Sequence, residues 1–266
     1  YPNIEVGMRA VTGTIDDPVS TNETMEFYNG KWDFNLYLAY LQYNAMSQGL
    51  MLTGGMVANP WLHTDLVWDS DVTFTGLAGS WHFLNNDEKV LRMWDPFITA
   101  GAFPVDEINQ VKFGMESESI PEDKWLYGVQ FGTHVNLHDQ SRLSAGLAYY
   151  HYDNITGERN QPGNDLQDST APTFVQKGNT MWDISADGDG TLYGLASEYE
   201  LLNATVIYDY AGFDPYHVTL TGDLVKNMAF DRDEVNEKFG FDLDDRDFGY
   251  QFGVAVGRPG VSEAGN

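Results

Sequence analysis

Lys124-Trp-Leu-Tyr-Gly-Val-Gln-Phe-Gly-Thr-His-Val-Asn-Leu-His138 is the stretch of sequence that decides the fold. Large apolar residues recur at every second position, and small or polar residues stand between them. The apolar set is Trp125, Tyr127, Val129, Phe131, Val135 and Leu137. The other set is Gly128, Gln130, Gly132, His134 and Asn136. Because successive side chains of a strand point to opposite faces, the stretch predicts a long strand with one apolar and one polar face.

The same period of two recurs on both sides of this stretch. In residues 31–45 we predict an apolar face made of Trp32, Phe34, Leu36, Leu38 and Tyr40. About ten strands are expected, over residues 4–13, 31–45, 49–57, 73–84, 91–103, 124–138, 141–153, 192–210, 216–227 and 246–257. The run 192–210 is interpreted as one strand bulged near residues 201–203. Two strands with a turn there remain the alternative.

Connections between these strands alternate between short and long. The long ones are residues 14–30, 58–72, 104–123, 154–190 and 228–247. Such alternation is typical of an up-and-down meander with one elaborated end. The long connections hold 27 of the 40 acidic residues but only 6 of the 14 basic residues. The sequence therefore predicts that negative charge gathers at one end of the sheet.

Composition excludes several classes of function. A formal net charge of −26 opposes nucleic-acid binding. Cysteine is absent, so disulfides and thiolate metal sites are excluded. The six histidines show no ligand spacing, and the sequence contains no Gly-x-Ser-x-Gly motif, so we do not expect an enzyme.

One acidic stretch resembles the first half of a calcium loop, with Asp183, Asp187 and Asp189 at the ligand positions. Gly194 stands where an EF-hand requires its bidentate acid, so a true EF-hand is excluded. A weak calcium site at these three aspartates stays open, and no other cofactor is expected.

Strand length and composition favour a membrane barrel over a soluble sandwich. A strand that crosses a bilayer at a slant needs about 9–11 residues, whereas ordinary strands have about 5–6. Aromatic residues stand near the ends of the apolar faces, as in the girdles of outer-membrane barrels. We therefore predict an all-β fold, an antiparallel up-and-down transmembrane β-barrel. A soluble acidic β-sandwich that binds glycans is the alternative.

Several motifs resemble the bacterial "putative porin" family of Gram-negative outer-membrane β-barrels. The most specific is Met56-Val-Ala-Asn-Pro-Trp61, followed by Thr64-Asp-Leu-Val-Trp-Asp-Ser-Asp71 and Gly76-Leu-Ala78. Two others are Thr12-Gly13 with Asp17-Pro-Val-Ser-Thr-Asn22, and Phe97-Ile-Thr-Ala-Gly-Ala-Phe-Pro104. Leu224-Val-Lys-Asn227 and Gly253-Val-Ala-Val-Gly257 follow in the same order.

The resemblance spans nearly the whole chain and implies one β-barrel domain over residues 1–266 that continues beyond both ends. Family members often carry arginine where this chain has Gly55, and they usually extend past the position of Asn266. Ten strands with two bare edges are not viable in lipid. We therefore expect roughly 12–18 strands in the full barrel, or a second chain. The implied partners are outer-membrane lipid and lipopolysaccharide, small hydrophilic solutes, and further copies of the chain.

The loop at residues 59–71 combines two tryptophans with three aspartates between two strands. Indoles need an apolar surface and carboxylates need water, and the mouth of a barrel offers both. We predict that the loop folds inward as a constriction, with Asn59, Trp61, Asp65, Trp68, Asp69 and Asp71 as its key residues.

The polar faces of the strands supply candidates for the pore lining. These are Arg9, Asp33, Asn35, His82, Arg92, Gln130, His134, Arg142, Glu198, Glu200, Thr221, Asp223 and Gln251. Charged rings set ion preference in channels. The predicted function is passive diffusion of small hydrophilic solutes with a preference for cations. A structural barrel that anchors or sheathes a partner or surface assembly, without an open channel, is the alternative.

Overall fold

The computed structural model describes residues 3–12, 34–45, 48–83, 93–108, 121–138, 140–175, 178–188 and 190–258. Ten long strands dominate it. They are β1 (Ile4–Thr12), β2 (Phe34–Ala45), β3 (Leu50–Ala58), β4 (Thr73–His82), β5 (Trp94–Asp106), β6 (Lys124–His138), β7 (Ser141–Asp153), β10 (Tyr199–Phe213), β11 (Tyr216–Asn227) and β12 (Phe248–Gly257).

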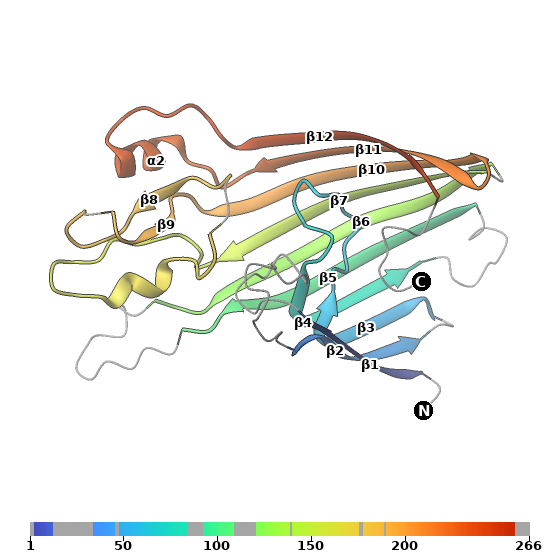
Figure 1. The fold of residues 1–266 in the computed structure, drawn as a ribbon, viewed down its shortest axis with the longest axis horizontal. Coiled ribbons are helices and arrows are strands. Elements are labelled where there is room, and N and C mark those ends of the chain that lie inside the picture. The colour runs from blue at the N-terminus through green and yellow to red at the C-terminus, as the bar shows by residue number, and fades with distance from the viewer. Residues whose placement is uncertain are drawn as a thin grey trace, which may run out of the picture.

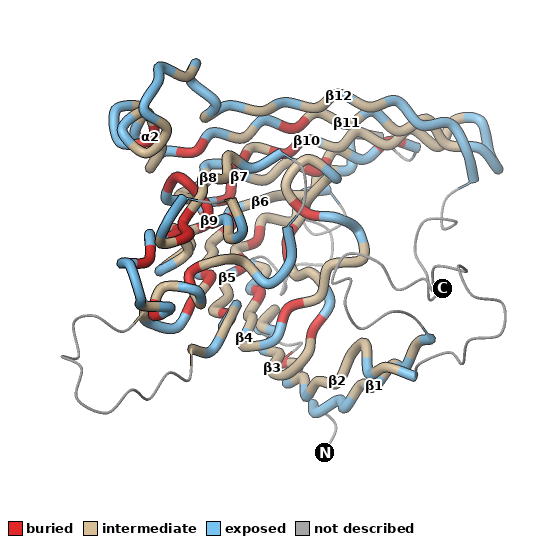
Figure 2. Tube along the Cα trace, turned by 60° about the vertical axis from the view of Figure 1, so that its left-hand side comes forward, coloured by how far each residue is buried: buried red, intermediate tan, exposed pale blue. Residues whose placement is uncertain are grey.

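These strands form a single antiparallel sheet in the order β1-β2-β3-β4-β5-β6-β7-β10-β11-β12, so every strand pairs with the next long strand in sequence. Within the described residues β1 and β12 do not pair with each other, and the sheet is open. It curves from one edge to the other (Figures 1 and 2). The predicted all-β, up-and-down antiparallel architecture is confirmed.

Smaller elements gather at the end of the sheet where the long connections lie (Figure 1). They are the short strands β8 (Met181–Asp183) and β9 (Tyr193–Leu195), the 3-10 helix η3 (Leu166–Thr170) and the helix α2 (Arg232–Phe239). Asp231 caps α2 by accepting hydrogen bonds from the amides of Asp233 and Glu234. Gly240 ends it with φ 71°, a left-handed conformation that favours glycine. Among the described residues, no helix has the length and apolar character needed to cross a membrane.

The predicted single strand over residues 192–210 is wrong. Residues 193–195 form β9 and pair with β8, outside the main sheet. Backbone hydrogen bonds from Gly157 to Leu195 and from Ala196 to Thr180 hold this segment within the long connection. The predicted bulge near residues 201–203 is also absent, because residues 201–210 keep regular register with both β7 and β11.

The prediction for the apolar face of β2 holds only in part. A register shift against β1 at Arg9 and Ala10 inserts an extra residue in β2, which reverses the alternation from there on. Phe34 and Leu36 are exposed on one face, whereas Leu38 and Tyr40 turn to the opposite face and line a pocket there. Trp32 lies outside the described residues.

One face of the sheet exposes a nearly continuous apolar surface, called here the outer face. On β12 it consists of Phe248, Tyr250, Phe252, Val254 and Val256, with 59–75% of each side chain exposed. Aromatic residues stand near both ends of this face. At the long-connection end they include Trp125, Tyr127, Tyr149 and Tyr250, and at the short-turn end Trp81, Phe83, Trp94 and Tyr216. An apolar band flanked by aromatic residues matches a surface that contacts lipid.

Candidate functional site: a loop across the inner wall

The connection between β3 and β4, residues 59–72, lies on the inner face of the sheet, opposite the apolar outer face. Its polar side chains stabilise it locally. The Asn59 carboxamide oxygen accepts from the Trp61 amide at 3.0 Å, and an Asp69 carboxylate oxygen accepts from the Asp71 amide at 3.1 Å. Both are turns of the type that aspartate and asparagine favour. We call residues 59–72 the inner loop.

Two glycines of β3 and β4, near this loop, have positive φ angles and lie close to the backbone of a neighbouring strand. Gly55 has φ 123° and Gly76 has φ 148°, and the two face each other across the β3–β4 ladder. A Cβ atom at Gly55 would come within 2.3 Å of the Ala39 carbonyl oxygen, and one at Gly76 would come equally close to that of Ala102. Side chains are therefore excluded at both positions.

The apolar side of the inner loop packs into the main hydrophobic cluster of the protein. Trp61 and Trp68 are 4% and 7% exposed. Both contact Tyr150 of β7 edge to face, with ring centroids 5.3 and 5.1 Å apart. Trp61 also lies over Gly128 of β6, where a Cβ atom would collide with the indole. Burying two indoles gives the loop a large apolar contact area with the wall.

Hydrogen bonds attach the inner loop to strands on both sides. The Leu62 amide donates to the Gln130 side-chain oxygen at 2.7 Å, and the Gln130 amide group donates to the Leu62 carbonyl at 2.8 Å. The Thr64 hydroxyl donates to Asp223 of β11, and the Tyr37 hydroxyl of β2 donates to the Asp71 carbonyl at 2.9 Å. One short loop therefore reaches from β2 to β11, which requires that it lie on the concave side of a curved sheet.

Asp223 is deeply buried, with 1% of it exposed. Its carboxylate also accepts hydrogen bonds from Asn203 and from the Thr205 hydroxyl, the latter at 3.1 Å. Hydrogen bonds from three neutral donors compensate for the loss of hydration of the buried charge. This cluster is the anchor farthest from the strands that carry the loop.

The carboxylates of the inner loop point away from the wall. Asp65 and Asp69 are exposed, and Asp71 is half-buried. The loop thus presents apolar groups to the sheet and negative charge to the water beside it.

The structure places most of the predicted pore-lining residues on the inner face. Gln130 and Asp223 contact the inner loop directly. Arg9, Asn35, His82, His134, Arg142, Thr221 and Gln251 share this face by the alternation of their strands. Asp33 and Arg92 lie outside the described residues.

Two of the candidates lie elsewhere. Glu200 is on the outer face, where its carboxylate is 3.4 Å from His151, and Glu198 is exposed in the connection before β10. The predicted inward orientation of Glu200 is wrong, because the regular register of β10 with β7 places Glu200 opposite His151 on the outer face. Without the bulge, the odd-numbered residues Asn203, Thr205 and Asp209 face inward instead.

Sequence reasoning therefore missed inward-facing polar residues of β10 and their partners. Asp209 accepts from Thr219 at 3.0 Å and contacts a ring nitrogen of His217 at 2.8 Å. Farther along the wall, His82 is 2.8 Å from Asp95. The alternation of polar residues along 203–209 was the available signal, and it required the correct register to be used.

The predicted calcium ligands lie in the β8–β9 region. Asp183 accepts hydrogen bonds from the Ser185 hydroxyl and amide and from the Gly190 amide at 3.1 Å. The Ser185 hydroxyl and amide together hold the pKa of Asp183 below its usual range. Asp187 is exposed, and Asp189 lies outside the described residues. In the part of the chain that the structure describes, no three acidic or histidine side chains converge as metal ligands would.

Comparison with known proteins gives one family and one solved structure. The model of the family described as "Putative porin" matches residues 2–266. The outer membrane channel DcaP of Acinetobacter baumannii is similar at 14% sequence identity with a TM-score of 0.34. The similarity covers 84% of this chain and 62% of the DcaP chain, so the chain spans less than two thirds of that channel's length. No curated protein sequence is significantly similar.

Proposed function

The chain belongs to the putative porin family of bacterial outer-membrane β-barrels, and from that premise we propose that it forms a channel for passive diffusion of small hydrophilic solutes. The family places the protein in the outer membrane, where its exposed apolar face contacts lipid. In this proposal the inner loop is the constriction, and the polar inner face of the strands is the wall of the pore.

The observation that supports the proposal is the attachment of the inner loop across the wall. Trp61 and Trp68 bury its apolar side, while Gln130 and Asp223 hold its backbone and hydroxyl groups. A loop held at several points keeps a defined shape, which a constriction needs in order to select solutes by size. The polar residues of the wall would line the remaining opening.

Cation preference follows from the charge that surrounds the passage. The inner loop carries three aspartates and no lysine or arginine. The long connections at the same end carry most of the acidic excess of the chain. An acidic entrance with low-dielectric walls concentrates cations near the opening. We therefore expect potassium to pass more readily than chloride.

Deletion of residues 62–69 tests the role of the loop. Single-channel conductance in a planar bilayer should rise, because the deletion removes the segment that narrows the pore. The barrel should still fold, because the strands that hold the sheet together remain. Reversal potentials in a KCl gradient, measured on the unaltered protein, test the cation preference. Unchanged conductance after the deletion would remove the constriction from the proposal, and a chloride preference would remove the ion selectivity.

A structural barrel without an open channel is the second candidate. The observation that favours this role is the burial of the inner loop against the wall, because a loop that filled the lumen would close the channel. A folded protein in the bilayer that shows no conductance, with or without residues 62–69, would support this role and exclude the channel.

A further inference from the structure

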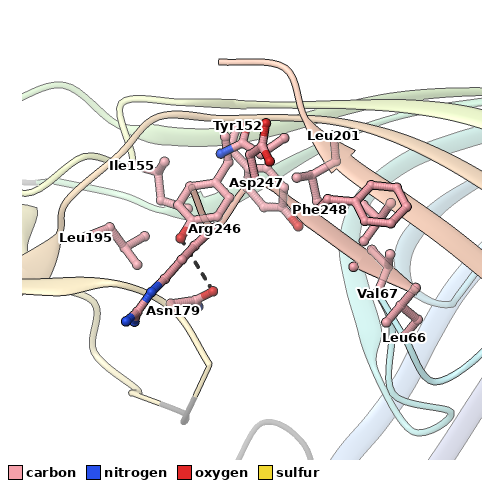
Figure 3. Close-up of a pocket in the computed structure, with 14 residues that line it drawn as sticks. Leu66, Val67, Tyr152, Ile155, Asn179, Leu195, Leu201, Arg246, Asp247 and Phe248 are labelled. Atoms are coloured by element: carbon pink, nitrogen blue, oxygen red, sulfur yellow. Dashed lines mark hydrogen bonds between the residues drawn. The ribbon is translucent and has the colours of Figure 1, made fainter. Parts of the chain in front are cut away.

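A pocket of about 400 Å³ lies on the inner face at the long-connection end (Figure 3). This volume is within the range of about 300–1,000 Å³ that is typical of small-molecule sites. One side is formed by Leu66 and Val67 of the inner loop, and the opposite side by Leu195 of β9 and Ile155. A solute that enters from the long-connection end would therefore reach the pocket at the side of the inner loop.

The floor of the pocket is apolar and aromatic. Tyr152 of β7, Tyr199 and Leu201 of β10, and Val225 of β11 all contribute to it. The two tyrosine rings are nearly perpendicular, with centroids 6.5 Å apart. In the view of Figure 3, Tyr152 and Leu201 lie above Val67 and Leu66. This floor can pack against the C–H groups of a flat or ring-shaped solute.

Polar groups of both kinds stand at the rim. Asn179 is exposed, and its carboxamide oxygen is 3.5 Å from the Tyr199 hydroxyl, so its NH₂ group is directed elsewhere. Arg246 is exposed and forms no ion pair within the described residues. Asp247 forms an ion pair with Lys226 at 3.2 Å and retains a second carboxylate oxygen as an acceptor.

The charges that line the pocket oppose each other. Arg246 and Asp247 are its only charged lining residues in the described chain, and they have opposite signs. An anion would be attracted by Arg246 but repelled by the acidic end through which it approaches. A cation would be attracted by the acidic end but repelled by Arg246. A neutral solute avoids both conflicts.

We propose that this pocket binds a neutral saccharide. A pyranose ring has a face of C–H groups that fits the tyrosine and aliphatic floor. Its hydroxyl groups are both donors and acceptors, which matches a rim that offers an amide, a guanidinium and a carboxylate. The claim that such a saccharide is a transported solute rests on the proposed function. Binding to the pocket can be measured without any transport.

Saturation-transfer NMR on the detergent-solubilised protein, with glucose as the probe, tests the proposal. We expect transfer to the ring protons of glucose. Asn179→Ala and Tyr199→Ala should each reduce the transfer at least fivefold. Tyr216→Ala is the matched control, because Tyr216 is exposed at the opposite end of the sheet and should leave the signal unchanged. Asn179 is itself exposed, so its substitution removes a polar group of the rim while the apolar side chains of the floor stay in place.

The results that would contradict the saccharide site differ from those that would contradict the proposed channel. Absence of transfer to glucose in the folded protein would overturn the site, as would equal transfer in all three variants. Transfer to benzoate but not to glucose would show that the pocket takes an amphipathic anion instead. Glucose binding without conductance would support the site and exclude the channel. Conductance without glucose binding would support the channel and exclude the site.

Discussion

Gln130→Leu is the most direct test of how the inner loop is held. Gln130 is fully buried, and its side chain both accepts from the Leu62 amide and donates to the Leu62 carbonyl. Leucine has a similar volume but no polar atoms, so the wall stays filled while both Leu62 groups lose their partner. The inner loop should then detach from β6 more often.

The size of the effect follows from those two hydrogen bonds. An unsatisfied buried donor or acceptor costs about 1–3 kcal/mol. Leu62 is half-buried, so water can replace part of the loss, and the lower end of the range applies. A total near 2 kcal/mol corresponds to about a 30-fold increase in the open population of the loop, since about 1.4 kcal/mol is a factor of ten.

Amide hydrogen exchange of residues 61–72 measures this opening. Exchange through local opening reports the free energy of the opened segment, so the rate should rise about 30-fold in the variant. The control is Gln42→Leu, because Gln42 is on the same face but bonds Asn44 and Thr53 instead of the loop. If exchange in the loop is the same in both variants, Gln130 does not hold the loop and the anchoring argument fails.

Three further predictions concern the outer face, the mouth and the long connections. Val129→Arg should cost about 2–4 kcal/mol if Val129 lies near the bilayer midplane, measured by reversible folding into lipid vesicles; a cost near zero would argue against a lipid-facing β6. Cation selectivity should decline between 0.1 and 1 M KCl, because the Debye length falls from about 10 to about 3 Å, and reversal potentials at both concentrations decide this. Hydrogen bonds from Ser185 lower the pKa of Asp183 in the folded protein. The ionised Asp183 carboxylate therefore stabilises the β8–β9 region at pH values above about 3.9, the pKa of aspartate in an unfolded chain. That contribution is lost as pH falls through the lower folded pKa. The Ser185 amide NMR shift should titrate there, and Asp183→Asn should abolish the titration.

The sequence by itself determined the class of fold. Apolar side chains stand at every second position, over runs longer than ordinary strands need. They share one face of the sheet, and either lipid or a second sheet must cover that face. Glycine and small polar residues on the other face, as in β6 and β12, favoured the membrane barrel. These are local patterns, so they could be read along the chain without knowing which strands meet.

The position of the inner loop was also foreseeable in outline, because two indoles and three carboxylates have few places where both are satisfied. Its anchors were not. Gln130 is about seventy positions away along the chain and Asp223 about one hundred and sixty, and only the curvature of the sheet brings them beside Leu62 and Thr64.

Tertiary structure alone decided the two features on which strand reasoning went wrong. The extra residue in β2 reverses which side chains face inward, and it exists only in the pairing with β1. Residues 193–195 have the composition of a strand but pair with β8, since the long connection offers them backbone partners before the main sheet begins. Alternation along a strand shows which residues share a face, but register with the neighbouring strand determines which face that is.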